Sequence, residues 1–356
     1  MLKLKYLWLI PAIIVVFTGC KPDDVKPKVV NVKLSDPVLS INEGDSVTLE
    51  VIFEPKGSSE EIAWTSSNPK VAIVSSTGKV KALSRGFALI KAQADSLSAT
   101  CQLTVTRTDL PYKLVWSDEF EGTELNSAVW NIETGGNGWG NQEKQFYTGR
   151  TENLRVENGH LVIEARKETY QSNDYTSARI NTRDKKAFKY GRIEARISLP
   201  TGKGTWPAFW MLGANFATAR WPLCGEIDIM EHTGSQPTTI VHAVHTADRN
   251  GSRGNNWSFK KTAGTVEGEF RTYAIEWEER ANEGDDNISF YIDGVKSTTL
   301  WEPHVNSTVQ QWPFKQDFFI ILNIALGGTM GGTIDDGMFA NPVLMKVDYV
   351  RVYQRE

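Results

Sequence analysis

The segment GEIDIMEHTG, residues 225–234, places three carboxyl groups among apolar neighbours, and the acids are Glu226, Asp228 and Glu231. Side chains alternate between the two faces of a strand, so a regular strand would turn Glu231 away from the other two acids and into the core. Burying an unpaired carboxylate there is unfavourable. A β-bulge near Ile229 and Met230 would add one residue and return Glu231 to the shared face. We therefore predict a bulged strand that presents all three acids on one surface.

Carboxyl groups arranged in this way suit the hydrolysis of a glycosidic bond with retention of configuration at the anomeric carbon. Such enzymes hold two carboxyl groups about 5–5.5 Å apart, one as nucleophile and one as general acid/base. A third carboxyl group between them raises the pKa of a neighbour, and an acid/base catalyst needs a raised pKa. A divalent metal site and a solvated acidic edge strand are the alternatives. The apolar residues between the acids argue against the edge strand, and calcium prefers loops rich in Asn, Asp and Gly.

Several motifs in the second part of the chain occur in the order found in one family of glycosidases. The acidic segment looks like the signature E-I-D-x-x-E of glycoside hydrolase family 16 in its bulged form. Other stretches resemble the laminarinases, the endo-β-1,3-glucanases of that family: WNIETGGNGWGNQEKQFYTGRTENLRVENGHLVIEARKE, YTSARINT, FKYGRIEARISLPTGKGTWPAFWMLG, LNIALGG and VDYVRVY. The resemblance implies a β-jelly roll and a retaining mechanism without a cofactor. It also implies Glu226 as nucleophile, Glu231 as general acid/base and Asp228 as the residue that orients and tunes both.

The same resemblance implies a set of residues that bind the sugar chain beside the acids. The matching positions are Asn153, Arg179, Trp206, Trp210, Trp221 and His245. Trp206 and Trp210 are four residues apart and so share one face of a strand. The His245 position is that of a histidine that holds the acid/base. Four of these residues also have an ordinary structural interpretation, which is core packing for Trp206 and Trp210, a surface salt bridge for Arg179 and a hydrogen-bonded core residue for His245.

The resemblance further implies one structural calcium on the convex side, far from the cleft. The matching positions are Glu119, Gly159 and Asp348. Two of these would supply backbone carbonyl oxygens and Asp348 a carboxylate. Oxygen ligands from distant segments are typical of calcium sites.

The sequence predicts an all-β fold, because it consists of short strand-like segments bounded by turn residues and helical periodicity is almost absent. Residues 28–106 predict a small β-sandwich, and the stretch IAWTSSNPKVAIVSSTGKVKAL resembles the bacterial Ig-like domains of group 2. Residues 107–113 are expected to form a linker. Residues 114–356 predict one large antiparallel sandwich with a long cleft. The expected fold is thus all-β, with a β-jelly-roll sandwich catalytic domain preceded by a small Ig-like β-sandwich.

The N-terminal residues 1–20 resemble a bacterial lipoprotein signal peptide. Two lysines precede an apolar run at residues 6–17, and Cys20 follows a small residue, as at a lipidation site. An ordinary secretion signal is the alternative. Residues 21–27 would form a tether, and the protein would be lipid-anchored in the cell envelope, on the periplasmic or outer face of the outer membrane. The remaining cysteines, Cys101 and Cys224, form either a disulfide or two buried free thiols.

Composition narrows the class of partner. The net charge of −4 and the pI near 5.9 argue against nucleic acid, whose binding surfaces are basic. The 12 tryptophans favour flat aromatic binding surfaces. We expect a monomer that acts on β-1,3-glucan and contacts the membrane through its anchor. A mixed-linkage β-glucan or an algal galactan is an alternative substrate. A non-catalytic glucan-binding protein is disfavoured because all three acids are present, and pure adhesion leaves the second domain unexplained.

Overall fold

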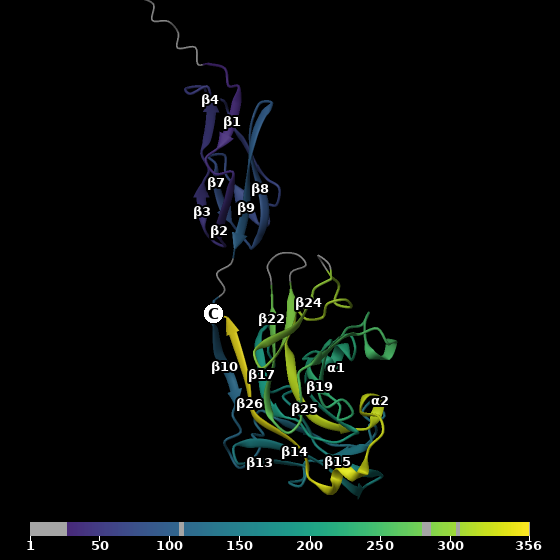
Figure 1. Ribbon diagram of the computed structural model, residues 1–356. Coiled ribbons are helices and arrows are strands. Elements are labelled where there is room, and N and C mark those ends of the chain that lie inside the picture. The colour runs from purple at the N-terminus through teal and green to yellow at the C-terminus, as the bar shows by residue number, and fades with distance from the viewer. Residues whose placement is uncertain (1–26, 107–109, 280–285, 304–306, 356) are drawn as a thin grey trace, which may run out of the picture. The chain divides into compact units, whose positions relative to one another are not determined.

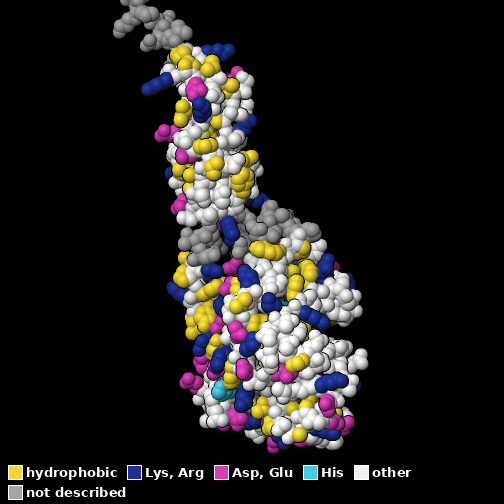
Figure 2. All heavy atoms as spheres, in the orientation of Figure 1, with side chains coloured by type: hydrophobic (Ala, Val, Ile, Leu, Met, Phe, Trp, Pro, Cys, Tyr) yellow, Lys and Arg dark blue, Asp and Glu magenta, His cyan; other side chains and the backbone are white. Residues whose placement is uncertain are grey.

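The computed structural model describes residues 27–106, 110–279, 286–303 and 307–355, and the chain forms two compact units, Met1–Thr106 and Arg107–Glu356 (Figure 1). The expected signal peptide, Cys20 and all but the last residue of the tether lie outside the described residues. No helix in the described ranges is long and apolar enough to cross a membrane. On the face seen in Figure 2, acidic and basic side chains are interspersed over the second unit.

The first unit is a small β-sandwich, as predicted. Its four-stranded sheet has the order β2 (Val38–Asn42), β9 (Leu97–Thr106), β8 (Gly86–Ala94), β5 (Ala63–Ser66). A three-stranded sheet has the order β3 (Ser46–Thr48), β7 (Lys79–Ala82), β6 (Ala72–Val74), and β1 (Asn31–Leu34) pairs with β4 (Val51–Glu54). Alternate residues of β8 and β9 are buried between the sheets, among them Ile90 and Leu103. This alternation is the signal from which the sandwich could be predicted.

The second unit consists of two large sheets, so the predicted all-β class is confirmed. The larger sheet has the order β12 (Gln145–Tyr147), β15 (Asn173–Ser177), β14 (His160–Tyr170), β26 (Val343–Arg355), β17 (Gly191–Ser198), β22 (Phe270–Glu278), β23 (Asn287–Ile292), β24 (Val295–Trp301). In the same sheet β10 (Tyr112–Asp118) pairs with β26, and β13 (Leu154–Glu157) pairs with β14. Because β10 already begins at Tyr112, the last two residues of the expected linker belong to this sheet.

The smaller sheet of this unit has seven strands and carries the acidic segment. Its order is β11 (Asn131–Glu133), β16 (Arg179–Asn181), β25 (Phe318–Leu326), β18 (Thr205–Gly213), β19 (Glu226–His232), β20 (Thr239–His245), β21 (Trp257–Thr262). In the described part of this unit the α-helical segments are single turns, α1 (Phe216–Ala219) and α2 (Gly328–Gly331), and there are two short 3₁₀ helices, η1 (Gly251–Arg253) and η2 (Asp336–Ala340). One face of β19 enters the core between the sheets through Ile227, Ile229 and Met230, all fully buried. The other face is therefore free to line a cleft.

Candidate active site

A β-bulge interrupts β19 between Asp228 and Glu231, as predicted. On one side, Asp228 pairs with Trp210 and Met230 with Phe209, so Ile229 has no partner in β18. On the other side, Asp228 pairs with Ala243 and Glu231 with Val241, so two residues of β19 face one residue of β20. The extra residue returns Glu231 to the face of Glu226 and Asp228. Three carboxyl groups therefore share one surface.

These acids lie in a cleft of about 950 Å³. The cleft is lined by side chains from every strand of the smaller sheet, from Glu133 in β11 through the acids of β19 to Lys260 in β21. Six strand spacings of about 4.8 Å give a length of about 29 Å across the sheet. A cleft of this length can hold several sugar units of one chain.

Indole N–H groups hold both outer acids. Trp221 Nε1 donates to Glu226 Oε2 over 2.8 Å, and Trp206 Nε1 donates to Glu231 Oε1 over 2.9 Å. Both tryptophans are half-buried and line the cleft, as expected for residues that stack on sugar rings. Each carboxylate thus has one oxygen fixed by a neighbouring aromatic side chain.

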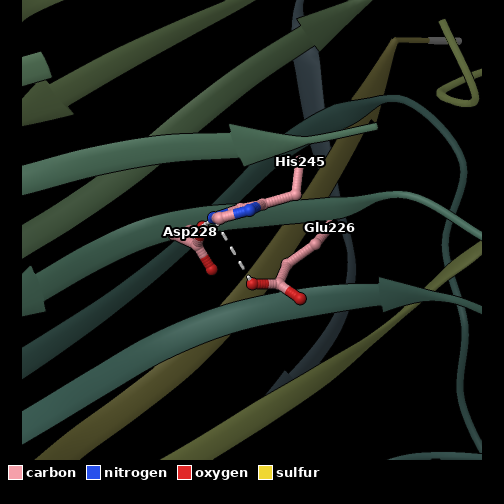
Figure 3. A group of neighbouring side chains, drawn as sticks. All are labelled: Glu226, Asp228 and His245. Atoms are coloured by element: carbon pink, nitrogen blue, oxygen red, sulfur yellow. Dashed lines mark ion pairs between the residues drawn. The ribbon is translucent and has the colours of Figure 1, made fainter. Parts of the chain in front are cut away.

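His245 bridges the first two acids (Figure 3). Its Nε2 lies 3.2 Å from Asp228 Oδ2 and 3.7 Å from Glu226 Oε1. The backbone N–H of Gly251 donates to Nδ1 over 3.0 Å, so the ring proton is on Nε2 and faces the acids. We expected His245 to hold Glu231; this is corrected by the register, which pairs His245 directly with Glu226.

Burial and the charges of neighbouring groups shift the pKa values of Asp228, Glu231 and His245. Burial, with the charge of Glu226, raises the pKa of Glu231 to about 7 against the opposing hydrogen bond from Trp206. Burial and the charges of Glu226 and Glu231 raise the pKa of Asp228 well above its usual range. Burial lowers the pKa of His245, but the pairing with Asp228 and the nearby carboxylates outweigh it and raise the value to about 9. The Gly251 N–H opposes the rise in the pKa of His245, because it donates to the lone pair of Nδ1. A doubly protonated imidazolium has no lone pair at that nitrogen. Near neutral pH the cluster therefore holds at least one shared proton.

A metal ion is the alternative use of this cluster. One ligand atom from each of Glu226, Asp228 and His245 lies within 4.8 Å of the others. However, the Nε2 that would bind a metal carries the ring proton, because Nδ1 already accepts from Gly251. A cation would have to displace that proton. The hydrogen bonds favour proton handling over metal binding.

Beside the acids, Arg179 lies between two indole rings. Its guanidinium carbon is 4.8 Å from the ring centres of both Trp139 and Trp210, and it pairs with Glu133. Arg179 and Trp210 both line the cleft. Trp139 is not among the sugar-binding residues predicted from the sequence, although its position in the Gly-rich motif GWGN could have suggested it.

A chain of hydrogen bonds fixes this part of the cleft from below. Trp210 Nε1 donates to Asn323 Oδ1 over 2.8 Å, and Asn323 Nδ2 donates to the Tyr147 hydroxyl over 3.1 Å. Tyr147 in turn donates to Glu143 Oε2 over 3.0 Å. Burial raises the pKa of Glu143 even though Gln145, Tyr147 and Asn141 all donate to it. The position of Trp210 is therefore set by a buried polar network.

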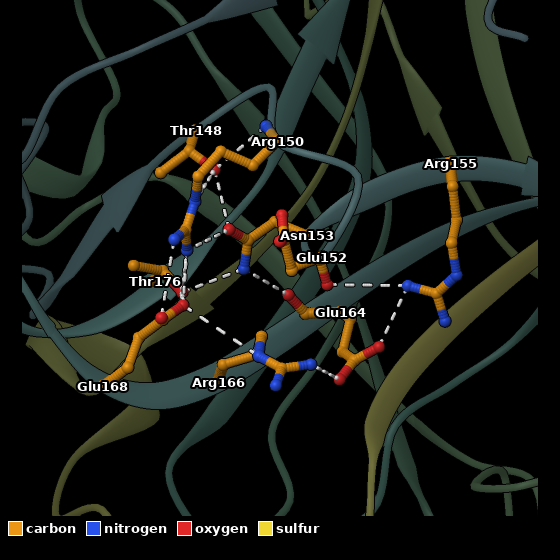
Figure 4. Close-up of polar contacts among 9 residues, drawn as sticks. All are labelled: Thr148, Arg150, Glu152, Asn153, Arg155, Glu164, Arg166, Glu168 and Thr176. Carbon is orange, nitrogen blue, oxygen red and sulfur yellow. Dashed lines mark hydrogen bonds and ion pairs between the residues drawn. The ribbon is translucent and has the colours of Figure 1, made fainter.

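Asn153 is not among the residues that line the cleft, which contradicts its expected role in sugar binding. It lies instead in a network of polar contacts (Figure 4). Its side chain is fully buried next to the larger sheet. The amide oxygen accepts from Thr148 over 2.7 Å and from Arg150 over 2.9 Å. The amide nitrogen donates to the Glu164 carbonyl over 3.0 Å and to the Thr176 hydroxyl over 2.9 Å. No polar capacity remains for a ligand.

The expected calcium positions come together without forming a favourable ligand set. β10 and β14 both pair with β26, which brings the segments of Glu119, Gly159 and Asp348 to one sheet. Yet the Asp348 carboxylate lies 2.6 Å from Arg196 and 3.7 Å from the His160 ring. The Asp348 carboxylate, which was expected to bind the ion, is thus already paired with Arg196, and the Glu119 carboxylate is paired with Arg351, so these side chains do not fit a calcium ion as they stand.

Cys101 and Cys224 are free, buried thiols. Strict strand alternation would place Cys224 on the face of Glu226, but Gly225 has a φ of +80° and breaks the alternation, so Cys224 packs in a small apolar cluster instead. Burial and the charge of Glu226 raise the pKa of Cys224 to about 12. It is therefore protonated and unreactive near neutral pH.

Comparisons with known proteins match both units. Residues 141–351 match the family model Glycosyl hydrolases family 16, and residues 28–105 match Bacterial Ig-like domain (group 2). A β-glucanase of Rhodothermus marinus is 44% identical over 249 residues, which are 68% of this chain and 85% of that protein. The crystal structure of a laminarinase from Flavobacterium sp. UMI-01 is 43% identical with a TM-score of 0.61, over 68% of this chain and 100% of that one. A laminarinase structure from Rhodothermus marinus is 42% identical with a TM-score of 0.64, and the match covers 69% of this chain and 98% of that one.

Proposed function

Because the chain belongs to glycosyl hydrolase family 16, with a bacterial Ig-like domain of group 2 before the catalytic domain, we propose that it is a retaining endo-glycosidase that hydrolyses β-1,3-glucosidic bonds in laminarin-type glucans. The observation that carries this proposal is the bulged strand β19, which presents Glu226, Asp228 and Glu231 on one face of a long cleft. Glucanases of this family need no cofactor for catalysis.

In the first step, Glu226 attacks the anomeric carbon while Glu231 gives its proton to the leaving oxygen. A pKa of about 7 keeps a large fraction of Glu231 protonated near neutral pH, as this step requires. The bond to the leaving sugar breaks, and a glycosyl ester forms on Glu226. Trp221 holds the attacking carboxylate through its indole N–H, and His245, which pairs with Asp228, lies 3.7 Å from the other oxygen of Glu226.

In the second step, water replaces the leaving sugar. Glu231, now ionised, takes a proton from this water, which attacks the anomeric carbon and frees Glu226. Two inversions leave the configuration unchanged. Asp228 remains between the two acids and pairs with His245, which limits the net negative charge beside the reacting sugar.

The shape of the cleft supports cleavage within a chain. The lining residues belong to all seven strands, and the acids lie near the middle rather than at one end. Five aromatic side chains line the cleft, where they can stack on sugars: Trp139, Trp206, Trp210, Phe216 and Trp221. The similarity to a β-glucanase and to two laminarinases supports β-1,3-glucan as the substrate.

The test is reducing-sugar release from laminarin, mixed-linkage β-glucan and agarose, by the wild type and by Glu226→Gln. We expect activity on laminarin that the variant lacks, with the β-anomer of the product seen first by NMR. Excess EDTA should leave the rate unchanged if the acid cluster handles protons rather than a metal. Activity on agarose alone would show that the proposed substrate is wrong. Binding of laminarin without cleavage would show that the protein is a glucan-binding protein and not an enzyme.

Three finer points also belong to this proposal. We propose lipidation of Cys20 and anchoring in the cell envelope, to be tested by membrane fractionation of Cys20→Ala. We propose a monomer, to be tested by light scattering. A structural calcium at Glu119, Gly159 and Asp348 would have to displace Arg196 from Asp348. Melting temperatures in calcium and in EGTA would reveal it, and equal values would exclude it.

A further inference from the structure

The bulge in β19 depends on a residue that has no partner in either neighbouring strand. Ile229 is skipped in the register with β18 and again in the register with β20. Its side chain is fully buried in the core. A buried carbonyl group at such a position needs a hydrogen-bond donor from outside the sheet ladder.

His242 supplies that donor. It is the single residue of β20 that lies between the partners of Asp228 and Glu231, directly opposite the bulge. Its Nδ1 lies 2.7 Å from the Ile229 carbonyl oxygen. Because a carbonyl oxygen only accepts, the proton must be on Nδ1, which fixes the tautomer of the ring.

The surroundings keep this ring neutral and in place. His242 is fully buried, and its ring lies 4.9 Å from the ring of Phe290 in β23 of the facing sheet. Burial, with a smaller effect of Lys261, lowers the pKa of His242 to about 4 against the opposing hydrogen bond to Ile229. Its Nε2 is buried without a hydrogen-bond partner among the described residues. Only the Nδ1 contact explains a polar ring at this position.

We propose that His242 is a positioning residue, whose Nδ1–H holds the Ile229 carbonyl and thereby fixes the bulge that turns Glu231 toward the cleft. The consequence for catalysis rests on the glycosidase activity proposed above. His242 does not line the cleft and acts through the backbone of β19. A general acid displaced by about 1 Å loses roughly 10²-fold in rate, because proton transfer requires close geometry.

Two substitutions separate the hydrogen bond from the ring. His242→Phe keeps the ring against Phe290 and removes the donor. His242→Asn places an amide nitrogen near the position of Nδ1 but leaves a cavity beside Phe290. We expect kcat on laminarin to fall about 10- to 100-fold in the Phe variant with KM changed less than about 2-fold, and to fall less in the Asn variant. The melting temperature should show the opposite order, because the cavity destabilises the Asn variant more.

A purely structural role for the ring predicts that kcat and melting temperature fall in the same order. A lower kcat for Asn than for Phe would therefore overturn the proposal. An independent measurement uses ¹⁵N NMR of the wild-type histidines, with the signal of His242 identified by its loss in the Asn variant. We expect a neutral ring protonated on Nδ1 down to about pH 5; a proton on Nε2 would contradict the contact. Inactivity of the wild type would refute the proposed function, and the NMR result would still decide the contact.

Discussion

Replacing Trp206 by Phe should move the alkaline limb of the pH–rate profile upward. In the wild type, the indole N–H donates to Glu231 over 2.9 Å and stabilises the ionised carboxylate, so it opposes the effect of burial, and the resulting pKa is about 7. A hydrogen bond to a charged group contributes about 1.5–3 kcal/mol. At about 1.4 kcal/mol for each pKa unit, its loss corresponds to an upward shift of about 1–2 units. Because the smaller ring also admits water, we expect about 1 unit.

The assay is kcat/KM on laminarin from about pH 5 to pH 10, which reports the apparent pKa values of the free enzyme. Trp210→Phe is the matched control. Trp210 lies on the same strand and lines the same cleft, but its N–H donates to the neutral amide of Asn323. The control should weaken sugar binding and leave the alkaline limb in place. A limb that stays or moves downward in Trp206→Phe, or that moves equally in the control, would refute the assignment of Glu231 as the titrating acid.

Three further substitutions test other parts of the structure. Asn153→Ala leaves several buried polar groups unpaired, so the free energy of unfolding should fall by about 2–4 kcal/mol and the melting temperature by about 5–10 °C, with KM unchanged. A raised KM at unchanged stability would instead support a role of Asn153 in sugar binding. Glu231→Gln should be up to about 3 kcal/mol more stable than the wild type at pH 8 and equal near pH 4. The reason is that between pH 4.5, the ordinary pKa of Glu, and about pH 7, Glu231 is protonated in the folded wild type and ionised in the unfolded chain, so the stability of the wild type falls as pH rises through this window. The same difference in melting temperature between variant and wild type at both pH values would contradict this. Cys224→Ser should retain kcat within about 3-fold and lose stability, because a hydroxyl replaces a thiol in an apolar cluster; lost turnover in a folded variant would make Cys224 functional.

The acid strand was predictable because its chemistry conflicts with a regular strand. Strand alternation would bury Glu231, and a bulge is the simplest local change that avoids this, so its position near Ile229 could be predicted from the sequence. The sandwich folds were predictable for a related reason, since alternation records which face of each strand is buried. In both cases the signal lies within one short segment.

The contacts that the sequence did not predict involve residues far apart in the chain. Asn153 is a polar residue whose four hydrogen-bond partners are brought together only by the larger sheet, and no local pattern distinguishes it from a residue that binds sugar. The partner of His245 depends on the register between β19 and β20, which the bulge shifts by one residue. Asn323, in β25, holds Trp210 through a contact between residues 113 positions apart. Register and long-range pairing are set by the whole sheet, so short motifs do not reveal them.

The apolar residues between the acids explain how the fold tolerates this site. Asp228 and Glu231 have raised pKa values because burial disfavours their charged forms, and each weakens the folded state as pH rises. His242 is buried on the core side of the same sheet, and one of its ring nitrogens has no partner among the described residues. On the same strand, Ile227, Ile229 and Met230 are fully buried in the largest apolar cluster, so the face opposite the acids anchors them. A bulge would let a flexible strand slip by one residue; here a slip would expose these three side chains and bury the acids. The alternation of acid and apolar residues thus fixes the register that catalysis requires.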